Sequence, residues 1–280
     1  MLIFQYHFVI LALLLCLFLS GIFTHLGYHV VRRGVIFVDL SLAQISALGA
    51  SFGVLIGFGE NYPAQNYIIS LGFTLIGSVL FVLFRQKKEK VPIEALIGIT
   101  YAGAIALSLI VLERSVKGTE EIKEMLAGSI LTVSPEEVIF IFMLCLIVGI
   151  IQWIYRKQLL MVTKRPEEAR NQGLKIWWWD LVFYMTFGFV VTSAVRIMGV
   201  LLVFAFLIIP TVAAIVATQG TKKCLIFGWI FSILGCVAGL ELSLRLDWSP
   251  CPTIVAVFLC LLILTWFAKR VKRSNVQIMS

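Results

Sequence analysis

The chain has 280 residues, of which 60% are hydrophobic and 14% are charged. Soluble globular domains carry about 25% charged residues, so this composition excludes a water-soluble protein. The formal net charge of +8 would by itself suit a nucleic-acid partner, but the basic residues lie in separate loops and not on one face, which argues against nucleic acid. The sequence therefore predicts an integral membrane protein surrounded by lipid.

The apolar residues gather into stretches that are long enough to cross a bilayer. A helix needs about 20 apolar residues to span the ~30 Å of hydrocarbon. We predict an all-α polytopic helix bundle that forms one domain over residues 1–280. No Lys or Arg precedes Arg32, so the first stretch lacks the basic region of a cleavable signal peptide and is expected to be retained. The nine predicted spans are residues 8–31, 35–58, 66–84, 93–112, 136–155, 177–197, 199–218, 224–245 and 253–268.

The loops between these spans alternate in charge. Basic residues follow the first, third, fifth, seventh and ninth spans, whereas the loops between them hold Glu60 and the mostly acidic segment 113–124. Because basic loops face the cytoplasm, the pattern predicts an external N-terminus and a cytoplasmic C-terminus.

Two histidines lie near the inner end of the first predicted span. His25 and His29 in HLGYH are four residues apart on one helical face, a spacing that can hold a divalent metal. A metal site shared with the nearby Asp39 is one interpretation, and an interfacial histidine pair without metal is the other.

The second predicted span carries an unexpected acid within VVRRGVIFVDLSLAQISALG, residues 30–49. Asp39 lies six residues beyond Arg33, roughly 9 Å inside the cytoplasmic boundary, and Gln44 lies near the midplane. A carboxylate there costs at least ~2.5 kcal/mol, so such acids usually face a bundle interior or a wet cavity.

Asp39 also begins a small polar face, because Ala43, Ser46 and Ala50 follow it at helical spacing. One interpretation is that this face lines a cation pathway. The alternative is that Asp39 makes a structural bond to Arg32 or Arg33.

Two segments between spans predict short helices. LAGSILTV (126–133) is apolar and rich in small residues, which suggests a short helix that dips back into the outer face. On the inner side, Pro166 followed by Glu167, Glu168 and Ala169, with Gly173 beyond, is typical of the first turn and the stop of a short cytoplasmic helix.

Three features of the second half are given structural explanations. Asp180 follows three tryptophans and looks isolated, so replacing it by alanine is expected to leave function intact. The three tryptophans are interpreted as an anchor at the membrane interface. Pro210 removes a backbone donor, so the seventh span should kink and can act as a gate. Glu241 and Arg245, four residues apart, form an expected ion pair.

No motif of catalysis is present. The chain has no GxSxG, HExxH or GxxxxGK[ST] sequence. We therefore expect a non-catalytic protein that does not hydrolyse ATP itself.

Three stretches taken in order resemble the membrane permease subunits of bacterial ABC importers for zinc, manganese and iron. They are residues 30–49, MLAGSILTVSPEEV (125–138) and MGVLLVFAFLIIPTVAA (198–214). The resemblance implies a homodimeric permease of the bacterial cytoplasmic membrane, a separate cytoplasmic ATPase that uses the ATP, and an extracytoplasmic metal-binding protein. A divalent metal would be the cargo, with no tightly bound cofactor.

The resemblance also implies roles for particular residues. RPEEARNQG (165–173) falls where the family's coupling helix docks on the ATPase, with Glu168, Ala169 and Gly173 matching its pattern. Asp39 resembles the pathway aspartate, but Ala43 stands where zinc and manganese members carry a histidine. Gln44, which follows, offers a neutral oxygen that favours harder cations. The expected transient metal contacts are Asp39, Gln44, Ser46, His25 and His29.

A secondary cation transporter driven by an ion gradient remains the alternative, with Asp39 as its coupling site. Such a transporter would show broken helices in both halves of the chain. The sequence offers Pro210 in the second half but no matching break in the first.

Overall fold

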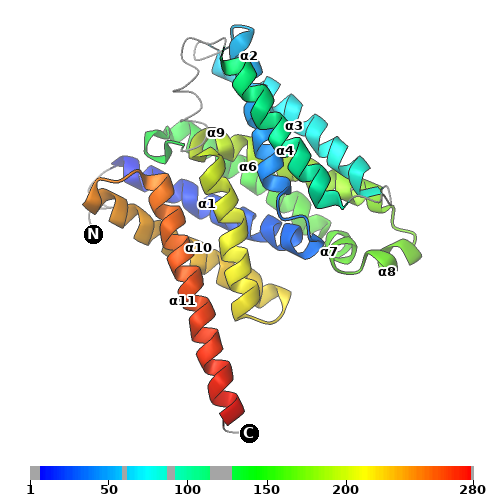
Figure 1. The fold of residues 1–280 in the computed structure, drawn as a ribbon, viewed down its shortest axis with the longest axis vertical. Helices are drawn as coiled ribbons and strands as arrows, with labels where there is room; N and C mark the ends of the chain where they lie inside the picture. The colour runs from blue at the N-terminus through cyan, green and yellow to red at the C-terminus, as the bar shows by residue number, and fades with distance from the viewer. Residues whose placement is uncertain (1–6, 59–61, 87–91, 114–127, 279–280) are drawn as a thin grey trace. The chain divides into compact units, whose positions relative to one another are not determined.

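The computed structural model describes residues 7–58, 62–86, 92–113 and 128–278, which are helical and contain no strand (Figure 1). Eight helices within these ranges are long and apolar enough to cross a membrane. The predicted all-α polytopic architecture is confirmed. The elements are α1 His7–Arg33, α2 Val38–Leu55, α3 Pro63–Gln86, α4 Ile93–Leu112, η2 Ile130–Thr132, α6 Pro135–Ile154, α7 Arg156–Lys164, α8 Pro166–Asn171, α9 Ile176–Ala217, α10 Thr221–Leu246 and α11 Pro250–Ile278.

The chain divides into two compact units, which we call the first and the second unit. The first comprises Met1–Val31, Ser129–Phe142 and Leu201–Ser280, and the second comprises Arg32–Gly128 and Met143–Val200. The last two residues of α1, Arg32 and Arg33, therefore belong to the second unit.

Small residues allow the helices of the second unit to pack closely. α2 packs against α3 and α4. A Cβ atom added to Gly49 of α2 would lie 2.8 Å from the Cα of Ser70 in α3, closer than such atoms approach, so the two backbones meet here. Hydroxyl groups bridge the same helices and α9, as in the 2.8 Å bond from Thr192 to Thr74 and the 2.8 Å contact between Tyr67 and Ser193.

The first unit is built in the same way from α1, α10, α11 and the end of α9. Gly235 and Gly239 of α10 contact Phe258 and Ile254 of α11 so closely that a Cβ atom would not fit. The predicted pair in α10 is present, with Arg245 donating to Glu241 at 2.8 Å.

Helix α9 contains two of the predicted spans. Its 42 residues would extend ~63 Å as a straight helix, about twice the hydrocarbon thickness. The helical dihedrals break at Gly199, whose φ of 74° and ψ of 162° suit glycine and few other residues. This break falls where the predicted spans 177–197 and 199–218 meet. The sequence also predicted a kink at Pro210, where no non-helical dihedral occurs, so a bend there stays a prediction.

The predicted outer helix, residues 126–133, lies partly outside the described residues, which begin again at Gly128. Its remaining part contains the short 3-10 turn η2. A capping box then starts α6, with the Ser134 backbone N–H donating to Glu137 and the Glu137 N–H donating to the Ser134 hydroxyl.

Candidate functional site

Asp39 lies in the first turn of α2 and is buried within the second unit, with 1% of its surface exposed. No side chain of the described residues hydrogen-bonds to either of its carboxylate oxygens. Because Asp39 lies in the first turn, the positive end of the α2 dipole stabilises a negative charge on its carboxylate. Within the described part of the chain, the carboxylate is therefore buried without a cationic side chain bonded to it.

The structural explanation considered for Asp39 does not hold. The Arg33 guanidinium, which was one of the two expected partners, binds Asp180 at 2.8 Å instead. Arg32, the other, is exposed. Neither arginine forms an ion pair with Asp39 among the described residues.

The other residues of the predicted pathway on α2 are buried but differ in what they contact. Ala43 is 1% exposed and offers no donor atom, and Gln44 is 6% exposed. The Ser46 hydroxyl lies 2.9 Å from the Ser70 hydroxyl, which in turn donates to the Ser46 carbonyl at 2.7 Å. Ser46 thus joins α2 to α3.

The two histidines lie together in the first unit. The ring centroids of His25 and His29 are 5.0 Å apart in an edge-to-face arrangement, and His29 is 1% exposed. No group of three or more His, Cys, Asp or Glu side chains suited to a metal ion occurs in the described part of the chain. The pair therefore offers two imidazoles and no further ligand of these types.

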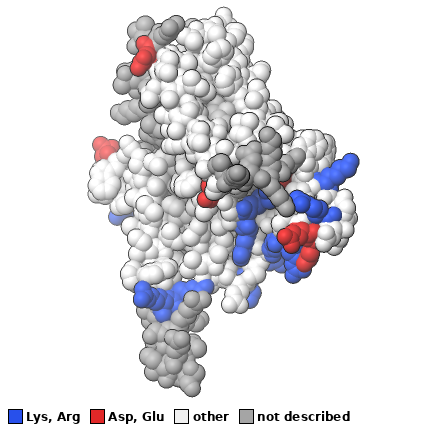
Figure 2. All heavy atoms as spheres, turned by 45° about the vertical axis from the view of Figure 1, so that its right-hand side comes forward, with Lys and Arg blue, Asp and Glu red and all other residues white. Residues whose placement is uncertain are grey.

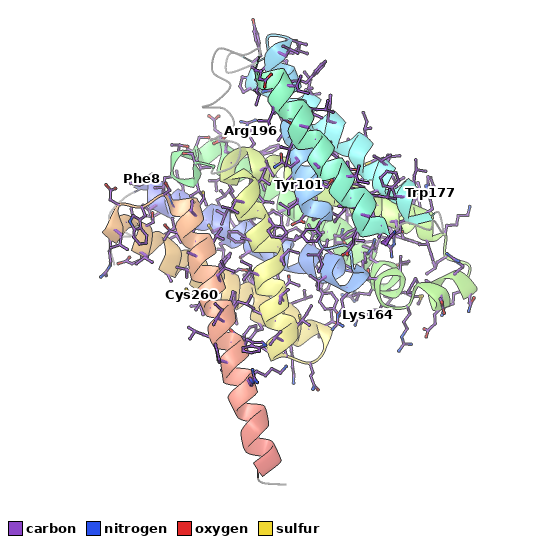
Figure 3. The ribbon with its side chains drawn as sticks, in the orientation of Figure 1. Phe8, Tyr101, Lys164, Trp177, Arg196 and Cys260 are labelled. Atoms are coloured by element: carbon purple, nitrogen blue, oxygen red, sulfur yellow. The ribbon has the colours of Figure 1, made fainter. Side chains whose placement is uncertain are left out.

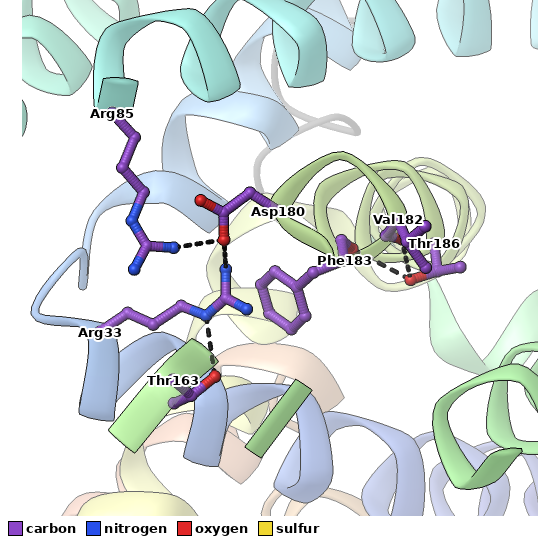
Figure 4. Close-up of polar contacts among 7 residues, drawn as sticks. All are labelled: Arg33, Arg85, Thr163, Asp180, Val182, Phe183 and Thr186. Carbon is purple, nitrogen blue, oxygen red and sulfur yellow. Dashed lines mark hydrogen bonds and ion pairs between the residues drawn. The ribbon is translucent and has the colours of Figure 1, made fainter. Parts of the chain in front are cut away.

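A buried ion network in the second unit was missed by the sequence analysis (Figure 4). Asp180, which we expected to be isolated, is 1% exposed and accepts bonds from Arg33 at 2.8 Å and Arg85 at 2.6 Å on the same oxygen. The Arg33 guanidinium also lies 4.2 Å from the Phe183 ring centroid, and its Nε donates to the Thr163 hydroxyl at 3.1 Å.

This network, which we call the arginine cluster, joins four elements through Arg33, Arg85, Thr163 and Asp180. They come from the ends of α1 and α3, from α7, and from the first turns of α9. The basic pair at the end of α1 was visible in the sequence. Its partner was not, because Asp180 lies 147 residues away from Arg33.

The predicted short helix that begins at Pro166 is present as α8. Pro166 occupies its first turn together with Glu167 and Glu168, where negative charge favours the helix dipole. Ala169 is fully buried. Gly173 has a φ of 78° and closes the helix, with the Leu174 N–H donating to the Ala169 carbonyl at 3.0 Å.

The surface around α8 is charged. Figure 2 shows Lys and Arg side chains gathered beside a small acidic group in the region of α7 and α8. The acidic side chains of α8 are Glu167 and Glu168, and Arg165 pairs with Glu168 at 3.1 Å. Lys164 at the end of α7 and Trp177 at the start of α9 are also exposed (Figure 3). The exposed basic residues of this segment are Arg156, Lys157, Lys164, Arg165, Arg170 and Lys175.

The chain is similar to curated membrane proteins of metal transport systems. It is 22% identical over 260 residues to the manganese transport system membrane protein of Synechocystis sp., covering 93% of this chain and 82% of that protein. It is 24% identical to the high-affinity zinc uptake system membrane protein of Haemophilus influenzae, covering 92% and 96%. A probable iron transport system membrane protein of the same organism is 26% identical, with 90% of each covered.

The fold is also that of a solved structure. The PsaBC structure from Streptococcus pneumoniae, determined in complex with a Fab, aligns with a TM-score of 0.80 at 18% identity and covers 95% of this chain and 93% of that one. The model of the ABC 3 transport family matches residues 5–269, nearly the whole chain. The chain therefore belongs to the ABC 3 transport family, as a membrane permease of a metal-ion ABC transporter.

Proposed function

We propose that this permease imports a divalent metal ion, zinc, manganese or iron, across the bacterial cytoplasmic membrane and that Asp39 contacts the ion in transit. The observation that carries this proposal is that the Asp39 carboxylate is buried and that no cationic side chain of the described residues is bonded to it. An ionised acid within a membrane requires a counter-charge, and the passing cation provides it.

The donor set favours weak, transient contacts. Asp39 provides carboxylate oxygens, Gln44 provides an amide oxygen, and Ser46 adds a hydroxyl that its bond to α3 partly occupies. Ala43 provides no ligand where a histidine would favour zinc. An oxygen-rich path of this kind suits a hard cation such as Mn²⁺ better than Zn²⁺.

The first unit contributes its own contacts in this proposal. His25 and His29 offer imidazole nitrogens from one face of α1. Because two ligands hold a metal less tightly than three or four, the pair would delay the ion without trapping it. In the same unit, Pro210 is proposed as the point where α9 bends during gating.

Energy for import would come from a separate cytoplasmic ATPase that docks on α8. The contact would involve Pro166, Glu167, Glu168, Ala169 and Gly173. The exposure of both glutamates supports this proposal, as does the rigid cap that ends the helix. The basic loops support an orientation with the N-terminus outside and the C-terminus in the cytoplasm. An extracytoplasmic metal-binding protein would deliver the ion to a homodimer of this chain.

The proposal is tested by whole-cell metal content. A deletion strain is compared by mass spectrometry with strains complemented by the wild type, by Asp39→Asn, or by Asp247→Asn, the same chemical change at an exposed residue. We expect one metal to be lost in the deletion strain and restored by the wild type and Asp247→Asn but not by Asp39→Asn. An unchanged profile of zinc, manganese, iron, cobalt and nickel would contradict the proposal.

A second measurement separates the ABC importer from an ion-gradient-driven transporter. The purified chain is placed in liposomes with and without its ATPase, and metal uptake is followed. Uptake that needs the ATPase and ATP supports the importer. Uptake by the chain alone under an ion gradient would contradict it.

A further inference from the structure

The arginine cluster joins Thr163 of α7 to the helix ends of the second unit. We propose that Arg33 is a positioning residue that ties the α7–α8 segment to the start of α2 and so passes movement of the coupling segment to Asp39. This inference rests on the proposed function, in which α8 receives the ATPase.

The Arg33 guanidinium connects α7 to α9. Arg33 donates through Nη1 to Asp180 of α9 and through Nε to Thr163 of α7. Its side chain is fully buried and lies over the Phe183 ring. Only arginine among the cationic residues has a planar fork that can bind two such partners at fixed angles.

On the cytoplasmic side, Thr163 is firmly linked to α8. α7 ends at Lys164 and α8 begins at Pro166, so Arg165 alone separates the two helices. The Arg165 N–H donates to the Met161 carbonyl at 2.8 Å, and the Arg165 carbonyl accepts from Ala169 at 3.0 Å. A displacement of α8 therefore carries Thr163 with it.

On the membrane side, a short turn connects Arg33 to α2. Four residues, 34–37, separate Arg33 from Val38, and the Val38 N–H donates to the Val35 carbonyl at 3.2 Å. Val35 is 2% exposed, so the turn is anchored in the unit. Asp39 is the second residue of α2, so a shift of Arg33 reaches the first turn in which the acid lies.

The charges around Asp180 allow the bond from Arg33 to Thr163 to break and form again. Asp180 accepts from both Arg33 and Arg85 on the same oxygen. When a buried acid has a single cationic partner, loss of that partner leaves an uncompensated charge, which is costly. Here Arg33 and Arg85 both hold Asp180, so the acid and the buried Arg33 stay paired when only the bond from Arg33 to Thr163 breaks.

The test separates this link from general stability. The permease, its ATPase and its extracytoplasmic binding protein are reconstituted in proteoliposomes, and uptake of Mn²⁺ and of Zn²⁺ is measured together with ATP hydrolysis. Thr163→Val removes the acceptor for Arg33 while keeping the side-chain shape. We expect metal moved per ATP to fall about fivefold, the factor that one net hydrogen bond represents, with ATPase binding retained.

Two control variants sharpen the result. Thr163→Ser keeps the hydroxyl and should restore the wild-type ratio of metal to ATP. Thr192→Val removes an equally buried interhelical bond, from Thr192 to Thr74, that does not involve α7, and should leave the ratio unchanged.

A double-mutant comparison tests the partner. Arg33→Lys keeps the charge but cannot bridge Thr163 and Asp180 together, so it should lower the ratio as Thr163→Val does. Combining the two should cost nothing further, because both remove the same contact.

Three outcomes would overturn the inference. They are an unchanged ratio of metal to ATP in Thr163→Val, an equal fall of that ratio in Thr192→Val, and a double variant in which the two effects multiply. Failure of the wild-type chain to bind its ATPase or to show ATP-dependent uptake would instead overturn the proposed function, and the inference with it.

Discussion

The second unit contains two buried aspartates that are equally hidden from solvent and differ in their partners. Asp39 and Asp180 are each 1% exposed. Asp180 is bound by two arginines, whereas no side chain in the described ranges bonds to the Asp39 carboxylate. A buried acid with counter-charges of its own is part of the architecture, and one without them is available to a charged ligand. Under the proposed function, the comparison separates a structural acid, Asp180, from a transport acid, Asp39.

The largest effect on stability is expected when the structural acid, Asp180, is removed. Asp180→Ala would leave the fully buried Arg33 without its counter-charge, which costs about 3–5 kcal/mol. The variant should show a markedly lower unfolding midpoint in detergent and reduced amounts in the membrane. A midpoint equal to that of the wild type would restore the expectation, drawn from the sequence, that Asp180 is dispensable.

The opposite result is expected for the transport acid. Asp39→Asn removes a buried charge without removing a bond to another side chain, so stability should stay level or rise, by up to about 2 kcal/mol. Metal uptake should nevertheless be lost. Thermal unfolding and uptake measured on the same preparation give both values. A variant that unfolds as easily as Asp180→Ala would remove the distinction between the two acids.

A smaller effect separates the two arginines of the arginine cluster. Arg85 has 19% of its side chain exposed whereas Arg33 has none, and Asp180 keeps Arg33 when Arg85 is changed. Arg85→Gln should therefore cost about 2 kcal/mol, the value of one bond to a charged group, and Arg33→Gln should cost more. Unfolding midpoints of the two variants provide the ranking, and the reverse order would show that Arg85 holds Asp180.

The smallest effect on stability is expected for the ion pair between Glu241 and the exposed Arg245. Arg245 is 63% exposed beside Glu241 in α10, and such pairs at helical spacing contribute about 0.5 kcal/mol or less. Arg245→Gln should leave the unfolding midpoint and uptake nearly unchanged. A large loss of uptake with normal folding would show that this pair belongs to the transport machinery.

Much of this architecture was predictable because membrane helices and short capped helices leave local signals. Runs of apolar residues located the spans, and Pro166 with Gly173 located α8 within its loop. The burial of Asp39 followed from its place inside an apolar stretch. All of these features depend on neighbouring residues in the chain.

The features that escaped prediction depend on residues far apart in sequence or on backbone dihedrals. Asp180 and Arg33 meet across 147 positions, and the partner of Ser46 lies on another helix. The break in α9 falls where the predicted spans 177–197 and 199–218 meet, but the positive φ that Gly199 adopts there was not predicted.

The most direct test of the distinction between the two acids is the effect of metal on thermal unfolding. The purified wild type, Asp39→Asn and Asp247→Asn are heated with increasing Mn²⁺ or Zn²⁺, since a ligand that binds the folded state raises its unfolding midpoint. We predict that one of these metals raises the midpoint of the wild type and of Asp247→Asn but not of Asp39→Asn. An equal rise in all three proteins would contradict the assignment of Asp39 to the metal pathway.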